Sequence, residues 1–576
     1  MQARIEFPAG EASLSLAFAK PCRILVARRP EEVLPVLRDA EQAARDGLWA
    51  VGMVAYEAAP AFDQALAVGE PLDDFPLAIF ALYEGPGADD GEAGGFECSP
   101  WQQEVSPQRF DADIAKLHAD IRAGRFYQSN HTTRLRAGFK GSPLSLYKAL
   151  RQSQPGGYGF YLASGAWQVL SVSPELFFDW KDDGTLTTRP MKGTAPRFAD
   201  EVEDARSAGA LRASEKERAE NLMIVDLLRN DLSRLARTGS VAVPELFTLE
   251  ALPSLWQMTS TVQCQTRPGL GLPDVFAALF PCGSVTGAPK VTAMQSIVER
   301  EISPRGPYCG ALGLIRPGGH ATFSVGIRTV LLKGDAERNA QCGIGSGITL
   351  DATAAGEFAE WQAKQRFLWR ASAGFSLIET LRLEAGEYPL LPRHLSRLGA
   401  SANHFGFVWS EQDVRAALVT LAEKQPKGIW RVRLLLDRKG IITTEAFPLE
   451  PTPAFYSVAW ASCSVASDNE FLRHKTTHRA VYDSHTPAQD SGLFDTLLYN
   501  ERNEVTEFTR GNVVVELEGR LLTPALSCGL LPGTLRAELL EKGVIAEAVI
   551  HRSDLDRATR VWFINGLRGQ VLARLR

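Results

Sequence analysis

Residues 188–194 read Thr-Arg-Pro-Met-Lys-Gly-Thr and place a single amine, that of Lys192, between a stiff segment and a glycine. Pro190 fixes its own φ and favours an extended residue before it, which predicts the end of a strand. Gly193 lets the backbone turn or approach a ligand closely. A lysine attacks carbon only when neutral, so burial, a cation such as Arg189, or a base must lower its pKa or remove its proton. A lone lysine beside a glycine is usually an exposed strand-end charge, so the interpretation depends on other motifs.

Length and composition indicate a globular protein with two to four folding units, because 576 residues exceed one ordinary core. Lys and Arg total 62 against 68 Asp and Glu, so no basic surface for nucleic acid is predicted. No apolar run approaches the roughly 20 residues of a membrane span and no signal segment is recognisable, so the cytoplasm is expected. The eight cysteines form no C-x-x-C pair, which predicts reduced thiols and no zinc site.

Turn residues mark the boundaries of the amino-terminal part. Residues 84–95 (EGPGADDGEAGG) are acidic and glycine-rich and predict an exposed loop. From Phe110 the pattern is helical, and Gly124 is a candidate cap at its carboxyl end. The stretch 169–178 (VLSVSPELFF) reads as a strand broken by proline, which puts Glu175 at a bend. Glu175 is either an exposed turn carboxylate or an acid–base group beside the lysine.

Two helical patterns bring further carboxylates into the first half. Residues 216–231 have apolar residues at helical spacing, and Glu220 and Asp226 lie in this apolar helix, which predicts packing on much of its circumference. Glu357 and Glu360 share one helical face because they are three residues apart, with a lysine at 364 one turn further on. Glutamates that converge without histidine or cysteine suit Mg²⁺ better than zinc.

Two glycine turns predict a binding site for an anion. They are 281–290 (PCGSVTGAPK) and 343–348 (GIGSGI), and the first is followed by a helix whose N-terminus would add a positive field. Neither turn has the spacing of a phosphate-binding P-loop, so a carboxylate ligand fits better than ATP. Arg328 could clamp that carboxylate, and Tyr308 could supply a hydroxyl group.

Together these motifs resemble the chorismate-utilising enzymes over about residues 105–370. The segments SPE, PMKGT, RAENLMIVDLLRND, GSVTGAPK, RGPYCGALG, IRT, GSGI and EFAEWQAK all occur in the order of that family. The resemblance implies an α+β fold with two stacked antiparallel β-sheets flanked by helices. In this family anthranilate synthases typically carry alanine at the position of Lys192, whereas aminodeoxychorismate synthase component I carries lysine. The resemblance therefore favours the second activity.

The resemblance also implies a role for each matching residue. Lys192 would attack C2 of chorismate while Glu175 protonates the leaving C4 hydroxyl, and ammonia would then add at C4 before Lys192 is expelled. The implied ligands of Mg²⁺ are Glu220, Glu357 and Glu360. The implied substrate-binding residues are Thr194, Tyr308, Arg328, Gly345, Ser346, Gly347 and Lys364. Where many relatives have histidine this chain has Gln257, for which only a hydrogen-bonding role is expected.

After Trp369 a new pattern of strands, turns and helices predicts a second enzyme domain. Its polar motifs are individually ordinary, since a basic cluster such as 472–479 (LRHKTTHR) is usually a solvated loop. Together they supply an amine for a Schiff base, a carboxylate for a pyridinium nitrogen, and an arginine with a helix N-terminus for a phosphate. This set of groups describes pyridoxal phosphate. The candidates are Arg397, Lys475, Glu507, Gly533 and Thr534.

Residues 373–576 resemble the class IV pyridoxal-phosphate enzymes, which include branched-chain and D-amino-acid aminotransferases and 4-amino-4-deoxychorismate lyase. The resemblance implies a two-subdomain α/β fold, with Lys475 as Schiff-base lysine and acid–base group and Glu507 as partner of the pyridine nitrogen. It implies a phosphate site at Arg397, Gly533 and Thr534. Aminotransferase and lyase share these groups, so both remain alternatives, together with a non-catalytic regulatory module. Fusion to an amine-producing half favours the lyase.

The two halves together predict an enzyme that converts chorismate and ammonia into 4-aminobenzoate and pyruvate for folate synthesis. No nucleophile-elbow cysteine with a histidine partner is apparent, so a separate glutamine amidotransferase subunit is the expected partner. A homo-oligomer formed through the second domain is compatible with the resemblance, although the sequence does not give the oligomeric state. The predicted parts are 1–105 (amino-terminal part of the synthase), 106–370 (its chorismate-binding catalytic part) and 373–576 (lyase).

Overall fold

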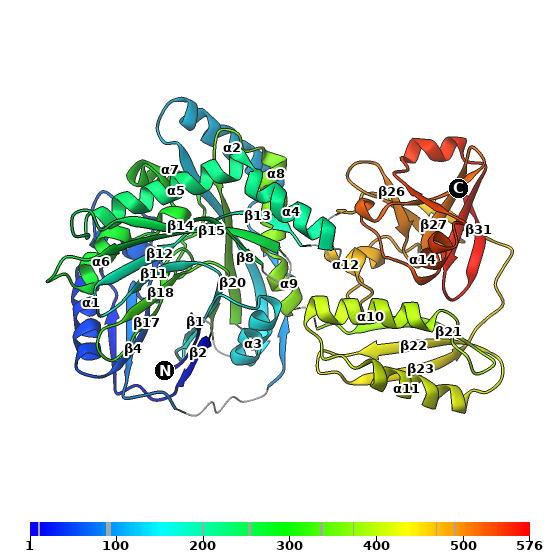
Figure 1. Cartoon of the computed structure of the whole chain (residues 1–576), viewed down its shortest axis with the longest axis horizontal. Coiled ribbons are helices and arrows are strands. Elements are labelled where there is room, and N and C mark those ends of the chain that lie inside the picture. The colour runs from blue at the N-terminus through cyan, green and yellow to red at the C-terminus, as the bar shows by residue number, and fades with distance from the viewer. Residues whose placement is uncertain are drawn as a thin grey trace. The chain divides into compact units, whose positions relative to one another are not determined.

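The computed structural model describes residues 1–9, 12–87, 94–197, 201–251, 255–334, 338–372, 374–467, 469–488 and 491–576. The chain divides into two compact units, Met1–Ser372 and Ala373–Arg576 (Figure 1). Much of the predicted 84–95 loop, namely residues 88–93, lies outside the described residues. Within the described residues, no helix is long and apolar enough to cross a membrane. All eight cysteines are free thiols.

Two ten-stranded sheets form the centre of the first unit, and among the described residues all their pairings are antiparallel. The first has the order β16 (Gly287–Ala288), β8 (Gln128–Gly141), β20 (Arg338–Ile348), β19 (Thr329–Lys333), β10 (Trp167–Ser173), β9 (Tyr158–Ala163), β1 (Gln2–Ala9) and β2 (Ala12–Phe18), with β6 (Phe96–Cys98) and β7 (Gln102–Gln103) beside β8. The second has the order β13 (Met191–Pro196), β15 (Leu255–Gln265), β12 (Thr185–Arg189), β11 (Leu176–Trp180), β18 (Ala321–Val325), β17 (Ala311–Ile315), β4 (Trp49–Val54), β5 (Ala78–Tyr83) and β3 (Arg23–Ala27), with β14 (Ala242–Ala251) beside β15.

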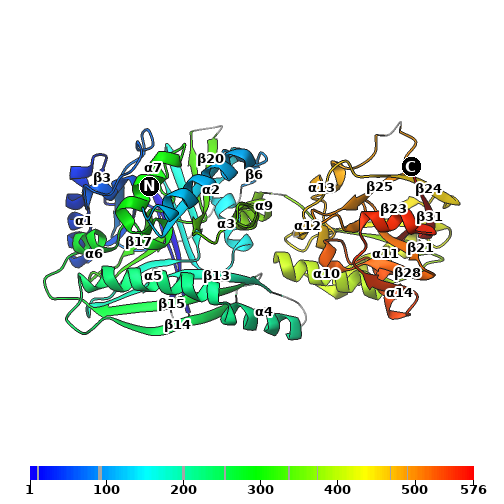
Figure 2. The same ribbon diagram turned by 90° about the horizontal axis from the view of Figure 1, so that it is seen from above.

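Apolar side chains from both sheets fill the space between them, including Ile5 and Phe160 from the first and Leu312 and Leu314 from the second. Helices cover the outer faces (Figure 2). Against the second sheet lie α1 (Pro30–Arg45), α5 (Glu215–Ser233) and α6 (Leu272–Leu279). Against the first lie α2 (Pro107–Arg122), α3 (Pro143–Ser153), α8 (Ala354–Lys364) and α9 (Arg366–Ser372). The helices α4 (Glu201–Ala213) and α7 (Lys290–Arg300) complete the unit. The predicted fold of two stacked antiparallel sheets flanked by helices is confirmed.

The proline and glycine around Lys192 shape the edge of the second sheet. Pro190 separates β12 from β13, although both strands pair with β15. The β13 register shifts between Met191 and Thr194, and Gly193 has a φ of +89°. A side chain there would be strained, and its Cβ would lie 2.9 Å from the Oε2 atom of Glu217. The bulge therefore requires glycine directly after the lysine.

The second unit contains two sheets. One is antiparallel, with β21 (Leu377–Glu384), β22 (Ile429–Leu436) and β23 (Ile442–Pro448), and is accompanied by α10 (Leu391–Phe405) and α11 (Glu411–Lys424). The other is mixed, in the order β26 (Val505–Phe508), β25 (Asp495–Tyr499), β24 (Phe455–Trp460), β31 (Gly569–Leu575), β30 (Arg560–Asn565), β27 (Asn512–Leu517), β28 (Arg520–Pro524) and β29 (Ala546–Ala548). Its helices are α12 (Glu470–Arg473), α13 (Ala480–Asp483) and α14 (Thr534–Glu541).

Candidate active sites

The first unit contains a cavity of about 490 Å³, which is within the usual range for small-molecule sites. It lies where β13, β20, α5 and α8 meet the bend between β10 and β11. All the site residues predicted from the first half of the sequence line it. They are Glu175, Lys192, Thr194, Glu220, Tyr308, Arg328, Gly345, Ser346, Gly347, Glu357, Glu360 and Lys364, and Gln257 also lines the cavity.

The Lys192 amine lies in an acidic environment, with its Nζ atom 3.4 Å from Oε2 of Glu220. Burial lowers the pKa of Lys192, but the charges of Glu220, Glu360 and Glu357 outweigh that effect and raise it above its ordinary value. Of the two routes expected to a neutral amine, lowering of the pKa by the surroundings is therefore not found, which leaves removal of the proton by a base. Arg189, the cation suggested for that effect, pairs with Glu250 instead. The amine is protonated at neutral pH here, so a base has to remove the proton before it attacks carbon.

Glu175 is 3% exposed at the bend between β10 and β11, where its backbone N–H donates to Oγ of Ser173. Burial raises the pKa of Glu175 to about 7, and a hydrogen bond with Ser284 and the charge of Lys192 limit the rise. Its Oε1 atom is buried without a hydrogen-bond partner among the described residues. This carboxyl group can therefore hold a proton near neutral pH.

The three predicted metal ligands come from two helices. Glu220 lies on α5, and Glu357 and Glu360 lie on α8. Lys364 bridges Glu360 at 2.6 Å and donates to the backbone oxygen of Gly345 at 2.8 Å. Among the described residues, no group of three or more histidine, cysteine, aspartate or glutamate residues is arranged to hold a metal ion. The expected burial of Asp226 is wrong, because its side chain is 60% exposed and pairs with Arg229.

The cavity lining also includes groups that can receive an anion. The Nη1 atom of Arg328 is buried and has no hydrogen-bond partner among the described residues. Burial lowers the pKa of this arginine to about 10, which leaves it charged at neutral pH. A Cβ at Gly343 would lie 2.2 Å from the ring of Tyr308, so glycine is needed for that ring to fit. The α7 N-terminus contributes none of the described lining residues, and Lys290 at its start pairs with Asp231. Direct contact of this helix with a ligand is therefore not found among the described residues, and the contribution of its field stays a prediction.

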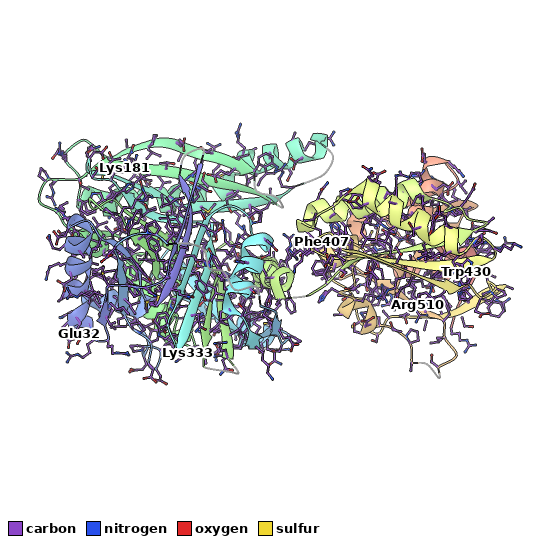
Figure 3. The ribbon with its side chains drawn as sticks, turned by 90° about the horizontal axis from the view of Figure 1, so that it is seen from below. Glu32, Lys181, Lys333, Phe407, Trp430 and Arg510 are labelled. Atoms are coloured by element: carbon purple, nitrogen blue, oxygen red, sulfur yellow. The ribbon has the colours of Figure 1, made fainter. Side chains whose placement is uncertain are left out.

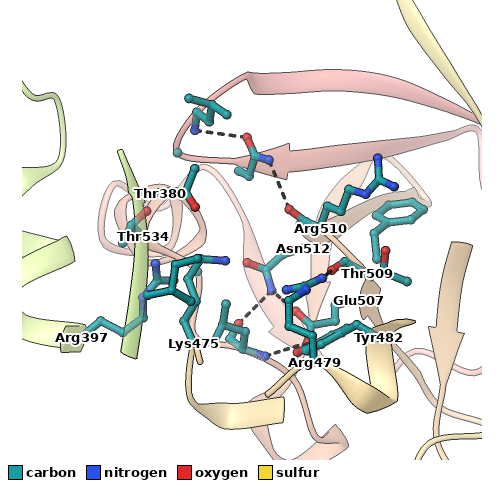
Figure 4. A pocket seen from close by; sticks show the side chains of 18 of the residues that line it. Thr380, Arg397, Lys475, Arg479, Tyr482, Glu507, Thr509, Arg510, Asn512 and Thr534 are labelled. Atoms are coloured by element: carbon teal, nitrogen blue, oxygen red, sulfur yellow. Dashed lines mark hydrogen bonds between the residues drawn. The ribbon is translucent and has the colours of Figure 1, made fainter. Parts of the chain in front are cut away.

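The second unit contains a cavity of about 430 Å³. All five residues predicted for the cofactor line it: Arg397, Lys475, Glu507, Gly533 and Thr534. In Figure 4 the amine of Lys475 lies between two groups of labelled residues, with Arg397 and Thr534 on one side and Glu507, Tyr482 and Arg479 on the other. Burial, helped by the charge of Arg397, lowers the pKa of Lys475 to about 8. The amine thus loses its proton more readily than an exposed lysine.

Glu507 is 2% exposed and is held by three donors. Its Oε1 atom accepts from the Tyr482 hydroxyl at 2.8 Å and from the backbone N–H of Leu531 at 3.1 Å. Its Oε2 atom accepts from Nδ2 of Asn512 at 3.2 Å. Burial nevertheless raises the pKa of Glu507 to about 8. A cation placed against this carboxyl group would stabilise its charged form.

Glu379 holds two residues that line the cavity, His394 and Arg397. It accepts from Nε and Nη2 of Arg397 at 2.9 and 2.6 Å, and its Oε2 atom lies 2.7 Å from Nδ1 of His394. Despite burial, the charge of Arg397 lowers the pKa of Glu379 to about 2. Arg397 also donates to the backbone oxygen of Pro532, directly before Gly533. Among the described residues these contacts use three of its five N–H groups, so two remain for a ligand.

The sequence model of the chorismate binding enzyme family matches residues 9–370, more than half of the chain. The chain belongs to the chorismate binding enzyme family. The model of class IV amino-transferases matches residues 376–574. This member of the family therefore joins a chorismate-binding domain to a class IV domain, and a class IV domain implies pyridoxal phosphate.

Relatives of the chorismate-binding domain carry two different names. Aminodeoxychorismate synthase component 1 from Klebsiella aerogenes is 37% identical over 262 residues, covering 46% of this chain and 57% of the relative. Anthranilate synthase component 1 from Streptomyces coelicolor is 36% identical over 286 residues, covering 49% and 54%. The chain thus spans about half the length of the curated relatives it matches. The solved structure of anthranilate synthase component I from Streptococcus pneumoniae is 24% identical to this chain, with a TM-score of 0.54. The match covers 64% of this chain and 92% of the solved chain, and it shows that the two share a fold.

The residues of the class IV domain fit pyridoxal phosphate, whereas in the chorismate-binding domain the type of donor, not the present arrangement of the described residues, suits Mg²⁺. In the chorismate-binding domain the donors are carboxylates, and Oε2 of Glu357 is buried without a partner among the described residues, which suits a hard divalent cation. In the class IV domain a Cβ at Gly533 would lie 1.8 Å from Oδ1 of Asn512, so only glycine fits before α14. The first backbone N–H groups of α14 can therefore face a phosphate beside Arg397.

The sequence interpretation gave no role to Gln128, which the structure brings into the first site. Its side chain is 1% exposed, and neither amide atom has a hydrogen-bond partner among the described residues. A Cβ at Gly347 would lie 2.1 Å from Nε2 of Gln128 and 3.1 Å from Nζ of Lys192, so the amide is near the amine. Gln257 has a different role, since it donates to the backbone oxygen of Gly193 at 2.9 Å. Glu379, Tyr482 and Asn512 were likewise missed in the class IV domain.

Proposed function

We propose that the chain makes 4-aminobenzoate from chorismate in two steps, amination to 4-amino-4-deoxychorismate and then elimination of pyruvate. The observation that carries the proposal is Lys192, which lines the same cavity as Glu175 and the free guanidinium edge of Arg328. Two relatives named for different aminations, an aminodeoxychorismate synthase component and an anthranilate synthase component, are about equally identical to this chain. Overall sequence identity therefore does not distinguish between the two activities. A lysine in the PMKGT stretch favours amination at C4.

In the first step, once a base has removed the extra proton of its ammonium group, Lys192 forms a bond to C2 of chorismate while Glu175 gives its proton to the leaving C4 hydroxyl, which departs as water. Both ring double bonds shift in this step. Ammonia then bonds to C4, the double bonds shift back, and the C2–nitrogen bond breaks, which releases Lys192 as the free amine while Glu175 takes back a proton from the new ammonium group. Glu175 suits this role because its pKa of about 7 lets it hold a proton at neutral pH. The orphaned amide of Gln128 near Lys192 can accept a hydrogen bond from the incoming ammonia.

The substrate's two carboxylates have separate candidate partners. Arg328, Tyr308 and the glycine turn at Gly345–Gly347 would bind the enolpyruvyl carboxylate, with Thr194 and Lys364 also in contact with substrate. Glu220, Glu357 and Glu360 would hold Mg²⁺, which neutralises the ring carboxylate when it is bound. Lys192 forms an ion pair with Glu220, and Lys364 forms one with Glu360. Metal binding therefore has to displace both ion pairs.

In the second step the class IV domain removes pyruvate from the amine. Pyridoxal phosphate, when bound, withdraws electrons from the carbon that carries the amine. Arg397, Gly533 and Thr534 would hold its phosphate, and Glu507 would face its ring nitrogen. Lys475 takes the proton from C4, which suits an amine whose pKa is about 8. The C3–oxygen bond then breaks, and the ring becomes aromatic as the three-carbon group leaves.

A separate glutamine amidotransferase subunit would supply ammonia to the first site, since no nucleophile-elbow cysteine with a histidine partner is apparent in the sequence. The Sγ atom of Cys463 and the Nε2 atom of His485 are 4.0 Å apart, but this exposed contact lies in the class IV domain and not at the first site. The deciding experiment is product analysis with Mg²⁺, pyridoxal phosphate, chorismate and an ammonium salt. We expect 4-aminobenzoate and pyruvate in equal amounts, and no product when glutamine replaces ammonium. Production of anthranilate, or efficient use of glutamine by the pure chain, would contradict the proposal.

The first step should depend on pH through Glu175. A proton donor with a pKa of about 7 is protonated below that value, so the rate should fall about tenfold per pH unit above it. The measurement is the amination rate from about pH 6 to 9 with neutral ammonia held constant. Glu175→Gln has no proton to give, so its rate should be lower by about 10² to 10⁴ below pH 7 and should lack the fall above that pH. A flat wild-type profile would exclude this residue as the donor.

The carboxylate cluster should make amination dependent on Mg²⁺. Glu357→Gln and Glu360→Gln each remove a hard oxygen anion, and we expect activity to fall by about a hundredfold or more, because ion–carboxylate stabilisation is worth several kcal/mol. The measurement is the amination rate as Mg²⁺ is titrated. Asp226→Asn is the matched control on α5, since Asp226 is exposed and paired with Arg229. Full wild-type activity in excess chelator would contradict the metal assignment.

A further inference from the structure

The cavity of the class IV domain carries more positive charge than its proposed cofactor requires. Its described lining has one carboxylate, Glu507, against one lysine and five arginines, namely Lys475, Arg397, Arg431, Arg479, Arg510 and Arg568. Glu379 compensates Arg397, and Asp483 lies 3.8 Å from Arg479. Among the described residues Arg431, Arg510 and Arg568 form no ion pair with a carboxylate. The site is therefore built for an anionic ligand in addition to the phosphate.

Two of these arginines are held by aromatic rings. The guanidinium carbon of Arg431 lies 4.7 Å from the ring centre of Phe447, and that of Arg510 lies 5.5 Å from the ring centre of Phe494. Stacking engages the flat face of a guanidinium group and leaves the N–H groups at its edge free for a ligand. Arg568 differs, because its Nη1 atom donates to the backbone oxygen of Glu450 at 2.7 Å.

The backbone around Arg510 is fixed. Arg510 lies in the turn between β26 and β27, with an exposed side chain (Figure 3). The fully buried Asp495 accepts the backbone N–H groups of Thr509 and Arg510, both at 3.1 Å. Arg431 lies on the exposed face of β22, in the other sheet of this unit. The two guanidinium groups thus come from a strand of one sheet and a hydrogen-bonded turn of the other, and both line one cavity.

We propose that Arg431 and Arg510 bind a carboxylate of the substrate and make the class IV domain selective for dicarboxylic amines. This inference rests on the proposed function, because 4-amino-4-deoxychorismate carries two carboxylates. An amino acid with an apolar side chain would desolvate these cations without pairing them, which costs binding energy. A site built to bind a polar group rejects analogues that lack it far more strongly than an apolar pocket does. The arginines thus favour a lyase substrate over branched-chain amino acids.

The first test is steady-state kinetics of the pyridoxal-phosphate-loaded full chain with 4-amino-4-deoxychorismate. Arg431→Gln and Arg510→Gln should each raise KM by about 10- to 100-fold, the loss expected for a charge-assisted hydrogen bond, with kcat changed much less. Arg433→Gln is the matched control, because Arg433 lies on the same exposed face of β22 but pairs with Glu445 at 3.5 Å and does not line the cavity. Arg431→Lys keeps the charge and should recover part of the affinity.

A second test does not depend on the lyase reaction. Isophthalate has two carboxylates on a ring and benzoate has one, and binding of each is followed by the change in cofactor absorbance. The wild-type chain should bind isophthalate at least about tenfold more tightly than benzoate, and both glutamine variants should lose that preference. If the preference holds but no 4-aminobenzoate is formed, the proposed function fails and the carboxylate subsite stands. Wild-type KM and unchanged preference in both variants would overturn the inference.

Discussion

Replacing Lys192 with alanine is expected to abolish formation of 4-amino-4-deoxychorismate, lowering its rate by about 10³-fold or more. The reason is that removal of a covalent nucleophile leaves only binding and electrostatic effects to accelerate the reaction. Because anthranilate synthases typically carry alanine at this position, ammonia that still reaches the ring should attack C2 and give anthranilate. The measurement is chromatographic analysis of products from chorismate and ammonium.

Lys216 provides the matched control for this experiment. It lines the same cavity, and its Nζ atom lies 3.9 Å from Glu220, the carboxylate that also pairs with Lys192. Its side chain is 54% exposed, so Lys216→Ala should change the thermal stability and the rate only slightly. If the two alanine variants lose activity equally, Lys192 acts through charge alone. If Lys192→Ala still forms aminodeoxychorismate at the wild-type rate, the nucleophile assignment is wrong.

The fold of the first unit was predicted from ordered motifs, not from strand patterns. Within this unit β1 pairs with β9, which lies more than 150 residues later. Pairing over such a distance leaves no local pattern, because alternation shows only which residues share a face. Resemblance to a family supplied the topology that the local pattern could not.

The pKa of Lys192 could not be predicted from the residues next to it in the sequence. Arg189 is three residues away, but it ends β12, whereas Lys192 lies on β13 after Pro190 and beside the register shift, so the two side chains need not face the same partner. Arg189 accordingly pairs with Glu250, while Lys192 pairs with Glu220 from α5. The charges that set the pKa of this lysine come from helices distant in sequence, so their sum could not be read from the PMKGT stretch.

Residues that support the sites were missed for a related reason. Glu379 shares the buried face of β21 with Leu377 and Leu381, and the strand pattern alone does not show what it binds. In the structure it is 2% exposed and binds both His394 and Arg397. Gln128 follows Tyr127 in a polar run, and only packing reveals that its amide is buried without a partner among the described residues. Side-chain hydrogen bonding depends on the complete fold, which sequence spacing does not give.

Replacing Lys475 with alanine is expected to stop the overall reaction at 4-amino-4-deoxychorismate. The first unit keeps its entire cavity, so chorismate should be consumed at the wild-type rate while 4-aminobenzoate formation falls by about 10³-fold or more. The variant should also lose the absorbance band of covalently attached pyridoxal phosphate. The measurement combines the spectrum with the time course of chorismate, intermediate and product.

A mixture of the Lys192→Ala and Lys475→Ala chains tests whether the two chemistries are separable. Each chain keeps one intact set of catalytic groups, since the two lysines line cavities in different units. If the amine is released to solvent, the mixture should make 4-aminobenzoate after a lag, and the lag should shorten as the concentration of the Lys192→Ala chain rises. Direct transfer within one chain would instead leave the mixture far below the wild-type rate, although purified 4-amino-4-deoxychorismate would still be converted by the Lys192→Ala chain. Conversion of that purified amine by the Lys475→Ala chain at the wild-type rate would show that Lys475 does not move the proton.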